Sequence, residues 1–519
     1  MRPRPFLFTV LALLLATGGC GGAGDVEPNA SPPNSSTDAD AYPSQPARIY
    51  VDESADDWDS LSVRAVDPGG QATNIQRLWV AHSQDRLFLQ MVVQPALNLQ
   101  EGNDLTLYLD TDNDPSTGAQ ALGLGAELTW TFGERSGEMV RDGAEQEVSH
   151  ADIGLTTLPT VRSDTFEVAL DRSAAPEGTP LFVGDSLRIA LSSPGDRLPN
   201  AKGGLGYALT SSDVPLTAPD IERPPGAALR LLSYNSVNNF NRNRSAIFDP
   251  ERQPSYRRIF AAVAPDVIAF QEVYSESAAE TEAVAESELG LSDEWVWEKH
   301  GADLVLGSRF PILDSEAIPG YESNRSAAFL LDADAALGSR LLVINMHPPC
   351  CNFGPDDGDP SRNAQRQQVV DNVIAFLRDL KQGDGPFVLP ENTPIIVMGD
   401  MNFVGEAQQP RTLRTGQIVH TDRFGPPAPP DWDGSSLLDT APRQVASPLH
   451  TTWVDTGSSF PPGRLDYAFV TDSVLEVVHE FVLHTPVLPA DLRATYGLRA
   501  SDTPTASDHL PVVLDVAPR

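Results

Sequence analysis

The sequence contains little cysteine, little positive charge and no long apolar run. Three cysteines among 519 residues are too few for a disulfide framework or a cysteine-based zinc site. Lys and Arg total 36 against 72 Asp and Glu, which gives a formal net charge of −36. That balance argues against nonspecific binding of nucleic acid or anionic lipid, because such binding depends on basic residues at phosphates. It does not exclude an enzyme that reaches a phosphoester through a metal ion.

The N-terminus has the pattern of an export signal. A basic start, Met1-Arg-Pro-Arg, precedes an apolar run over residues 6–16, which is too short to cross a bilayer as a helix. Thr17-Gly-Gly-Cys20 then resembles the lipobox of bacterial lipoproteins, with Thr17 where leucine is commonest. We therefore expect residues 1–20 to be a lipoprotein-type signal peptide and the protein to be exported and held at the cell envelope by lipid on Cys20. A plain signal peptide, which would leave the protein secreted, is the alternative.

Composition divides the rest of the chain. Hydrophobic residues make up 40% of the sequence, enough for real cores, and the length exceeds that of one ordinary domain. Residues 21–47 are Gly, Ser, Pro, Asn and Asp with almost nothing apolar, which predicts a disordered tether. A proline-rich break at 219–228 predicts a linker. Two globular units follow from this division, 48–218 and 229–519.

Strand signals dominate residues 48–218. Apolar runs at 78–81 and 87–93 flank a polar turn, which predicts a hairpin, and further short runs are bounded by turns. Many short strands without a convincing helix predict a β-sandwich. The unit also resembles bacterial sandwich modules related to carbohydrate-binding families, on the basis of Ile49-Tyr-Val-Asp, Trp58, the Asp110-Thr-Asp turn and Gly125-Ala-Glu. This resemblance implies a glycan ligand.

The turn at residues 110–118 offers carboxylates at alternate positions, Asp110, Asp112 and Asp114. Hard cations such as Ca²⁺ bind clustered oxygens, so the turn is compatible with a calcium site. It is equally compatible with an ordinary hairpin turn of Asp, Asn, Pro and Gly, which needs no metal.

After residue 228, apolar strands alternate with helices. The apolar periodicity predicts helices over 254–263 and 363–381. Several strands finish on polar residues, which packing does not explain, and polar groups at the ends of buried strands are typical of a functional site. These strands are predicted at 229–235, 266–272, 341–347, 394–402 and 464–470, with two more at 327–331 and 510–516.

The order of the motifs in this half resembles the endonuclease/exonuclease/phosphatase superfamily. The motifs are Ser-Tyr-Asn235, Phe-Gln-Glu272, Leu-Gly-Ser-Arg-Phe-Pro-Ile312, Asn-Met-His347, Gly-Asp400-Met-Asn402, Arg-Leu-Asp466-Tyr and Ser-Asp508-His509-Leu-Pro. That group includes pancreatic deoxyribonuclease, abasic-site endonucleases, inositol polyphosphate 5-phosphatases and bacterial sphingomyelinases. The resemblance spans nearly all of 229–516 and implies a four-layer α/β sandwich with two packed mixed β-sheets. The whole chain is therefore expected to be an α+β protein, with the β-sandwich preceding this domain.

The resemblance also implies a metal site. Glu272 corresponds to the principal ligand of Mg²⁺ or another hard divalent cation, which takes one or two carboxylates and keeps waters for the substrate phosphate. Asn235 and Asp508 correspond to residues that complete the metal shell, directly or through water.

The remaining motif residues carry proton transfer and positioning by the same resemblance. Asp466 corresponds to the carboxylate that orients His509, the base for the attacking water. Asp400 positions or helps to activate the nucleophile, and Asn402 is a neutral donor two residues later. His347 is the second histidine, which donates to the phosphate or protonates the leaving oxygen.

Two features of the site are left open by the motifs. The residue that partners His347 cannot be assigned, although the segment around Asp303 is the right region. The insertion from Pro348 to Arg362 contains Cys350 and Cys351, which are compatible with a vicinal disulfide or with two thiols.

The sequence thus predicts an exported, metal-dependent hydrolase of phosphoric esters, with phosphodiesters as the expected substrates. Nuclease, sphingomyelinase-like and other phosphodiesterase activities stay open, although the lack of a basic stripe makes nonspecific binding of nucleic acid unexpected. A surface binding or adhesion lipoprotein with an inactive phosphoesterase-like domain is the alternative. In either case the only expected membrane contact is the lipid anchor.

Overall fold

The computed structural model describes the chain from residue 42 onward with short gaps: 42–67, 74–211, 214–217, 219–239, 244–292, 294–319, 325–351 and 361–519. The signal peptide predicted for 1–20 and most of the tether predicted for 21–47 lie outside these residues and stay predictions. All of the described residues belong to one compact unit, Ala39–Arg519. Among them, no helix is both long enough and apolar enough to cross a bilayer.

The first half of the described chain contains two antiparallel sheets. The five-stranded sheet has the order β1 (Ala65–Val66), β2 (Asn74–His82), β3 (Arg86–Leu97), β11 (Ser163–Asp171) and β10 (Thr156–Leu158). The seven-stranded sheet has the order β13 (Asp196–Leu198), β12 (Ser186–Ser193), β4 (Thr106–Asp110), β7 (Leu128–Thr131), β8 (Ser136–Arg141) and β9 (Ala144–Val148), with β14 (Leu205–Ala208) also pairing with β12. A small hairpin, β5 (Ala119–Ala121) with β6 (Leu124–Ala126), and a one-turn helix, α1 (His150–Ile153), lie between strands.

The two sheets share one hydrophobic core, to which alternate residues of each strand contribute. Leu87, Leu89 and Met91 of β3 lie in the same buried cluster as Leu107 and Leu109 of β4. Successive side chains of a strand point to opposite faces, so this alternation directs one face of each sheet inward. The predicted β-sandwich is confirmed, and so is its predicted hairpin, because β2 and β3 pair antiparallel across a short turn.

The acidic turn after β4 has a different arrangement from the one its spacing predicted. Asp114 is exposed, and its carboxylate accepts hydrogen bonds from the backbone and hydroxyl of Ser116. The buried Glu127 takes its place, because one carboxylate oxygen each of Asp110, Asp112 and Glu127 lie within 4.8 Å of one another. Of the three carboxylates at alternate positions, Asp114 thus stands apart, because the pairing of β4 with β7 brings Glu127 to Asp110.

The second half contains two six-stranded mixed sheets. The first has the order β19 (Val296–His300), β20 (Leu304–Ser308), β18 (Val267–Gln271), β15 (Leu229–Asn235), β28 (Val512–Pro518) and β27 (Leu475–Val482). The second has the order β21 (Ile312–Ile318), β22 (Ser326–Leu331), β23 (Leu341–Met346), β24 (Ile395–Asp400), β26 (Asp466–Val470) and β25 (Leu438–Asp439). Parallel pairs, β15 with β18 and β23 with β24, occupy the middle of each sheet, and the other pairs are antiparallel. A short ribbon, β16 (Asn238–Asn239) with β17 (Arg244–Ser245), follows β15.

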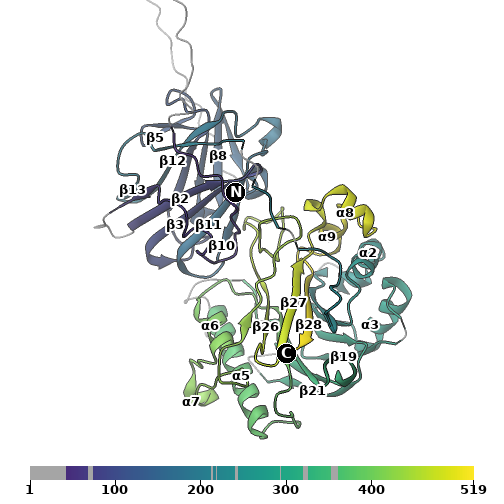
Figure 1. Ribbon diagram of the computed structural model, residues 1–519. Coiled ribbons are helices and arrows are strands. Elements are labelled where there is room, and N and C mark those ends of the chain that lie inside the picture. Colours follow the sequence, from purple (N-terminus) through teal and green to yellow (C-terminus); the bar gives the residue numbers. More distant parts are fainter. Residues whose placement is uncertain are drawn as a thin grey trace, which may run out of the picture. The chain divides into compact units, whose positions relative to one another are not determined.

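Helices cover the outer face of each sheet (Figure 1). The first sheet packs against α2 (Gln253–Val263), α3 (Ala278–Val284), the π-helical turn Ala285–Leu289 and α9 (Asp502–Ala506). The second packs against α5 (Arg362–Gln382) and α6 (Gln408–Thr415), with α7 (Thr421–Phe424) beside α5. The short helices α4 (Asp334–Leu337) and α8 (Ala490–Thr495) follow β22 and β27. The predicted helices over 254–263 and 363–381 are thus confirmed as α2 and α5.

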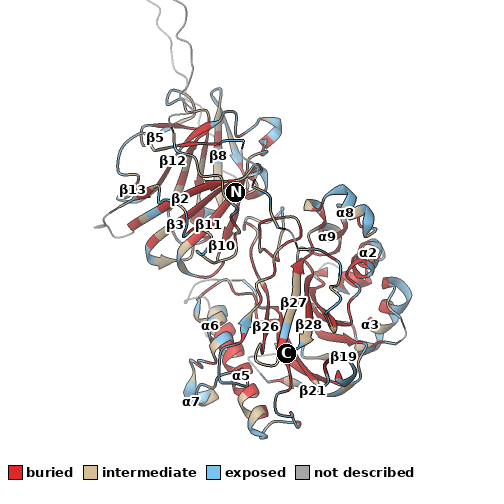
Figure 2. Ribbon diagram, in the orientation of Figure 1, coloured by how far each residue is buried: buried red, intermediate tan, exposed pale blue. Residues whose placement is uncertain are grey.

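Three buried clusters fill the spaces between these four layers. One joins α2 to the first sheet, one joins α5 to the second, and the third lies between the two sheets. Figure 2 shows the result, with the central strands of both sheets buried along their length and exposed residues gathered on the short helices. The predicted four-layer α/β sandwich is confirmed. The separability of the two halves as domains, with a linker at 219–228, stays a prediction.

Candidate active site

The site lies where polar residues continue the inner faces of the two six-stranded sheets. In β15 and β24, alternate apolar residues face the opposite sheet, and the same alternation carried to the end of each strand directs Asn235 and Asp400 inward. The apolar residues concerned are Leu229, Leu231, Ile396 and Met398. The same alternation, continued past the end of β23, directs His347 inward. Asp466 is the first inward-facing residue of β26. We call the boundary between the two sheets the inter-sheet seam.

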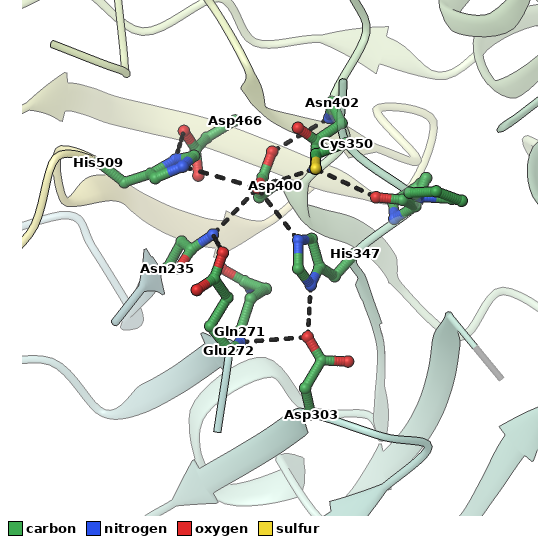
Figure 3. Close-up of polar contacts among 12 residues, drawn as sticks. Asn235, Gln271, Glu272, Asp303, His347, Cys350, Asp400, Asn402, Asp466 and His509 are labelled. Atoms are coloured by element: carbon green, nitrogen blue, oxygen red, sulfur yellow. Dashed lines mark hydrogen bonds and ion pairs between the residues drawn. The ribbon is translucent and has the colours of Figure 1, made fainter. Parts of the chain in front are cut away.

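Three pairs of polar side chains cross the inter-sheet seam (Figure 3). Asn235 Nδ2 donates to Asp400 Oδ2 at 3.0 Å. His509 Nδ1 lies 2.8 Å from Asp466 Oδ2. His347 Nδ1 is hydrogen-bonded to Asp303, which precedes β20 of the first sheet. Each pair takes one member from each sheet, so the site exists only where the sheets are packed together.

Asp400 is the centre of this network. Its carboxylate accepts hydrogen bonds from Asn235 and from both the side chain and the backbone of Asn402. The Nε2 atoms of His347 and His509 lie 3.4 and 3.7 Å from its Oδ2. Burial alone would raise the pKa of Asp400, but the histidines and Asn235 lower it. Asp400 is therefore a buried anion between two imidazoles, as its predicted positioning role requires.

The second carboxylate of the network holds the His509 ring. Asp466 is fully buried, and His509 is 6% exposed. Burial would lower the pKa of His509, but Asp466 and Asp400 raise it to about 10. Burial raises the pKa of Asp466 only to about 6. Near neutral pH the two residues are therefore an ion pair, with Nδ1 bound to Asp466 and Nε2 turned toward Asp400.

Asp303 is the partner of His347 that the motifs could not identify. Its carboxylate also accepts the backbone N–H of Glu272 at 3.2 Å, and Arg325 Nη1 lies 3.8 Å from its other oxygen. Burial would lower the pKa of His347, but Asp303 and Asp400 raise it well above its usual value. His347 is thus a held, protonated imidazole, which suits a proton donor. The available signal was Asp303 itself, a carboxylate directly before a buried strand.

Glu272 reaches the site through an unusual backbone conformation. Gln271, the last residue of β18, faces the opposite sheet and donates to Asn345 at 2.8 Å, so an extended Glu272 would face the helices. Its φ of 65° is rare for a residue with a side chain and turns it back toward the site. There its carboxylate accepts from Asn235 at 3.2 Å and from the backbone of Asn238 at 2.6 Å.

The third predicted metal ligand, Asp508, has other partners in this structure. Its carboxylate accepts from Trp453 Nε1 at 3.0 Å and lies 3.4 Å from the Ser507 hydroxyl. That hydroxyl donates to the backbone carbonyl of Asn235 at 2.8 Å, which places Asp508 next to the end of β15. The structure therefore brings Asn235 and Glu272 into contact and leaves Asp508 linked to them through Ser507.

The donor atoms fit a hard divalent cation. Ligand atoms of Asp400, Asp466 and His509 cluster within 4.8 Å, but the shared imidazole already accounts for that closeness. Across the whole site, five carboxylates (Glu272, Asp303, Asp400, Asp466 and Asp508) face two imidazoliums and the Arg325 guanidinium, which leaves two uncompensated negative charges. Mg²⁺ and similar ions take oxygen donors and would balance that charge. Glu272 and Asp508, which are only half-buried, offer such oxygens beside Asn235.

The two neighbouring cysteines lie beside this network. Cys350 and Cys351 form a vicinal disulfide, which settles the state that the sequence left open, and Cys350 is drawn beside Asp400 in Figure 3. Residues 352–360 of the predicted insertion lie outside the described residues. The described part resumes at Ser361, whose hydroxyl caps α5 by accepting from the backbone of Ala364.

Comparison with known proteins agrees with this site. The family model for the Endonuclease/Exonuclease/phosphatase family matches residues 239–509, a stretch that contains the network except for Asn235. The chain belongs to the Endonuclease/Exonuclease/phosphatase family. Members of this family are hydrolases that act on phosphoester bonds, and the matched stretch covers just over half of the chain. No curated protein matches the chain.

Three solved structures are similar to part of this chain at low sequence identity. A family protein from Leptotrichia buccalis is 14% identical, with a TM-score of 0.35, and the match covers 56% of this chain and 99% of that one. Sphingomyelinase C from Streptomyces griseocarneus is 17% identical, with a TM-score of 0.32 and coverages of 55% and 98%. The Staphylococcus aureus beta toxin with bound magnesium ions is 13% identical, with a TM-score of 0.30 and coverages of 55% and 99%.

Proposed function

We propose that the protein is an exported, Mg²⁺-dependent phosphodiesterase in which His509, returned to its neutral form by the positive charge of the bound cation, accepts a proton from the attacking water. The observation that carries this proposal is the His509–Asp466 pair, whose second ring nitrogen faces Asp400 at 3.7 Å. A water bound beside Asp400 would lie within reach of that nitrogen. The Asp303–His347 pair stands on the other side of Asp400, so one pair can accept a proton while the other donates one.

Each residue of the network has a role that its contacts define. Asp466 fixes the tautomer and orientation of His509 and stabilises its charged form after proton transfer. His347, kept protonated by Asp303, donates to the phosphate or to the leaving oxygen. Asn402 holds Asp400 in place through two hydrogen bonds, one from its side chain and one from its backbone.

The metal would be held by Glu272 and Asn235, with Asp508 completing the set. When bound, a divalent cation supplies positive charge to the phosphoryl oxygens and the attacking water and lowers the pKa of nearby imidazoles. Glu272 is already directed into the site by its left-handed backbone. Asn235 stands between Glu272 and Asp400 and donates to both through Nδ2, so it would offer Oδ1 to the ion after its amide turns over.

The test uses the full-length protein and a matched pair of variants. Hydrolysis of bis(p-nitrophenyl) phosphate, p-nitrophenyl phosphate, plasmid DNA, RNA and sphingomyelin is measured with Mg²⁺ and with a chelator. We expect metal-dependent cleavage of the diester and a loss of activity in Glu272→Gln that moderate excess Mg²⁺ does not restore. Glu286→Gln, at an exposed glutamate outside the network, controls for the charge change and should retain full activity.

The panel also separates the substrate classes. Cleavage of sphingomyelin but not of nucleic acids would assign a sphingomyelinase-like activity, and the reverse would assign a nuclease. Undiminished turnover of Glu272→Gln in chelator would contradict the metal mechanism. No turnover of any substrate by the metal-loaded protein would favour the alternative, a binding lipoprotein with an inactive domain.

Export, the lipid anchor and a glycan ligand of the sandwich complete the proposal. Their support is the N-terminal sequence, 1–20, and the resemblance of the sandwich to carbohydrate-binding modules. In a bacterial host, metabolic labelling with a fatty acid should mark the wild type and not Cys20→Ala. Labelling of both would contradict the anchor at Cys20. A glycan array probed with the full-length protein tests whether the sandwich binds glycans. Glycan binding that survives unfolding of the sandwich would show that another part of the chain binds them.

A further inference from the structure

Three carboxylates meet at the end of β4 in the sandwich, far along the chain from the catalytic residues. They belong to Asp110, Asp112 and Glu127, and their nearest oxygens lie within 4.8 Å of one another. Leu109 of β4 pairs with Leu128 of β7, so the next residues, Asp110 and Glu127, stand opposite each other. Like charges in that position destabilise a sheet.

Asp110 is the member of the cluster that lacks a close hydrogen-bond donor. Its side chain is fully buried, at 0% exposure, and neither carboxylate oxygen makes a close hydrogen bond with a described residue, although the nearby backbone N–H of Gly125 lowers its pKa. Burial, followed by Glu127 and Asp112, outweighs that effect and raises the pKa of Asp110 to about 6. An ionised carboxylate buried in this way is costly unless a positive charge compensates it.

The nearby arginines do not provide that charge. Arg141 and Arg188 act on the cluster only at a distance. Arg141 directs its guanidinium to the Thr111 hydroxyl and the Leu181 carbonyl. Arg188 directs its own to Asn113, Gly203 and Tyr42. The carboxylates therefore face one another without a direct cationic contact in the described part of the sandwich.

The Thr117 hydroxyl brings a further oxygen atom to the cluster, with too few hydrogens for the acceptors around it. It lies 3.1 Å from both carboxylate oxygens of Asp112, 3.0 Å from Glu127 Oε1 and 2.9 Å from the Asp114 carbonyl. A hydroxyl carries one hydrogen, so it can satisfy only one of these four acceptors. The other acceptors therefore lie close to one another without a hydrogen between them, and a cation could compensate them.

We propose that Asp110, Asp112 and Glu127 bind one Ca²⁺ ion that joins the end of β4 to the start of β7. The donors are all oxygens, as a hard cation requires. Ca²⁺ accepts six to eight oxygens in flexible geometry, whereas Mg²⁺ demands a near-octahedral shell and retains several waters. Because Asp110 and Glu127 are both fully buried, they leave little room for retained water, and this favours Ca²⁺.

The bound ion stabilises the sandwich instead of taking part in hydrolysis. It would compensate the facing charges of Asp110 and Glu127 and hold the following turn against β7. Because an ion that binds only the folded state stabilises it by mass action, the unfolding temperature should rise with the Ca²⁺ concentration.

The experiment counts calcium and follows unfolding in the full-length protein. Equilibrium dialysis against ⁴⁵Ca²⁺ with excess Mg²⁺ is performed on the wild type, Asp110→Asn and Asp112→Asn. Asp114→Asn is the matched control, because this exposed carboxylate lies in the same turn outside the cluster. We expect the wild type and Asp114→Asn to bind one more Ca²⁺ per chain than the other two. A difference between variants with identical catalytic residues is independent of any metal at the active site.

Calorimetry supplies the second measurement. Ca²⁺ should raise the Tm of the wild type and of Asp114→Asn and leave that of Asp110→Asn unchanged. In chelator, Asp110→Asn should unfold at the same temperature as the wild type or higher, because Asn removes a buried, unpaired charge. The proposal is overturned if Asp110→Asn binds as much Ca²⁺ as the wild type or if Asp114→Asn loses the ion. It is also overturned if Asp110→Asn lowers the Tm equally with Ca²⁺ and with chelator, since Asp110 would then stabilise the fold without binding Ca²⁺.

Discussion

Replacing Asp466 by Asn isolates the contribution of one carboxylate to the proposed base. The pKa of His509 lies at about 10, roughly 3.5 units above the ordinary value, and each unit corresponds to about 1.4 kcal/mol. Because burial opposes this rise, Asp466 at 2.8 Å and Asp400 at 3.7 Å together favour the charged imidazole by at least about 5 kcal/mol. If the closer carboxylate supplies about half, Asp466→Asn should cost about 2–3 kcal/mol in the transition state, which is roughly a 30- to 150-fold fall in kcat/KM.

The full test is a double-mutant cycle. His509→Ala removes the proton acceptor and should lower kcat/KM by about 10²–10⁴-fold. Because Asp466 acts through His509, the double variant should be no worse than His509→Ala alone. The assay is kcat/KM on one phosphodiester at saturating Mg²⁺, with circular dichroism to verify folding. Strictly multiplicative losses would refute the pair, and a near-wild-type His509→Ala would remove the base assignment.

Three further predictions concern other buried groups. Burial lowers the pKa of His82 to about 4, so the unfolded chain binds a proton at a higher pH than the folded one, and the free energy of unfolding should fall by up to about 3 kcal/mol as the pH drops from 6.5 to 4. His82→Gln should flatten this part of the curve of Tm against pH. An unchanged slope would show that His82 does not cause the pH dependence. Asn345→Ala should cost about 1–3 kcal/mol in urea unfolding, because it removes the Asn345 acceptor from the buried Gln271 amide and leaves that amide only its bond to Ala269 and the longer contact with Ser233. A loss below about 0.5 kcal/mol would show that water replaces Asn345. Asp303→Asn should lower kcat more than it raises KM, because it frees the second catalytic histidine; a pure KM effect would assign Asp303 to substrate binding.

The catalytic half was largely predictable because its signals are local. A buried strand has period two, and the same periodicity that places Leu229 and Leu231 on the inner face also places Asn235 there. The helices α2 and α5 were predictable from their apolar faces. Motif order then supplied the roles that periodicity cannot.

Contacts between distant segments were not predictable in the same way. Asp303 precedes its strand and lies 44 residues from His347, so no spacing rule connects them. Glu127 joins Asp110 through cross-strand pairing, whereas the alternate spacing of the turn favoured Asp114. The backbone conformation that turns Glu272 into the site also leaves no trace in the residue types around it.

The order in which the chain builds the two six-stranded sheets sets when the enzyme can first work. The first sheet begins with β15 to β20, is interrupted by the whole of the second sheet, and is completed only by β27 and β28. During synthesis, Asp466 therefore has no partner until His509 has emerged from the ribosome, 43 residues later. A nascent chain should show no turnover before that point, and neither should truncations that end before residue 509. The order of the strands would thus delay hydrolysis until both sheets can close.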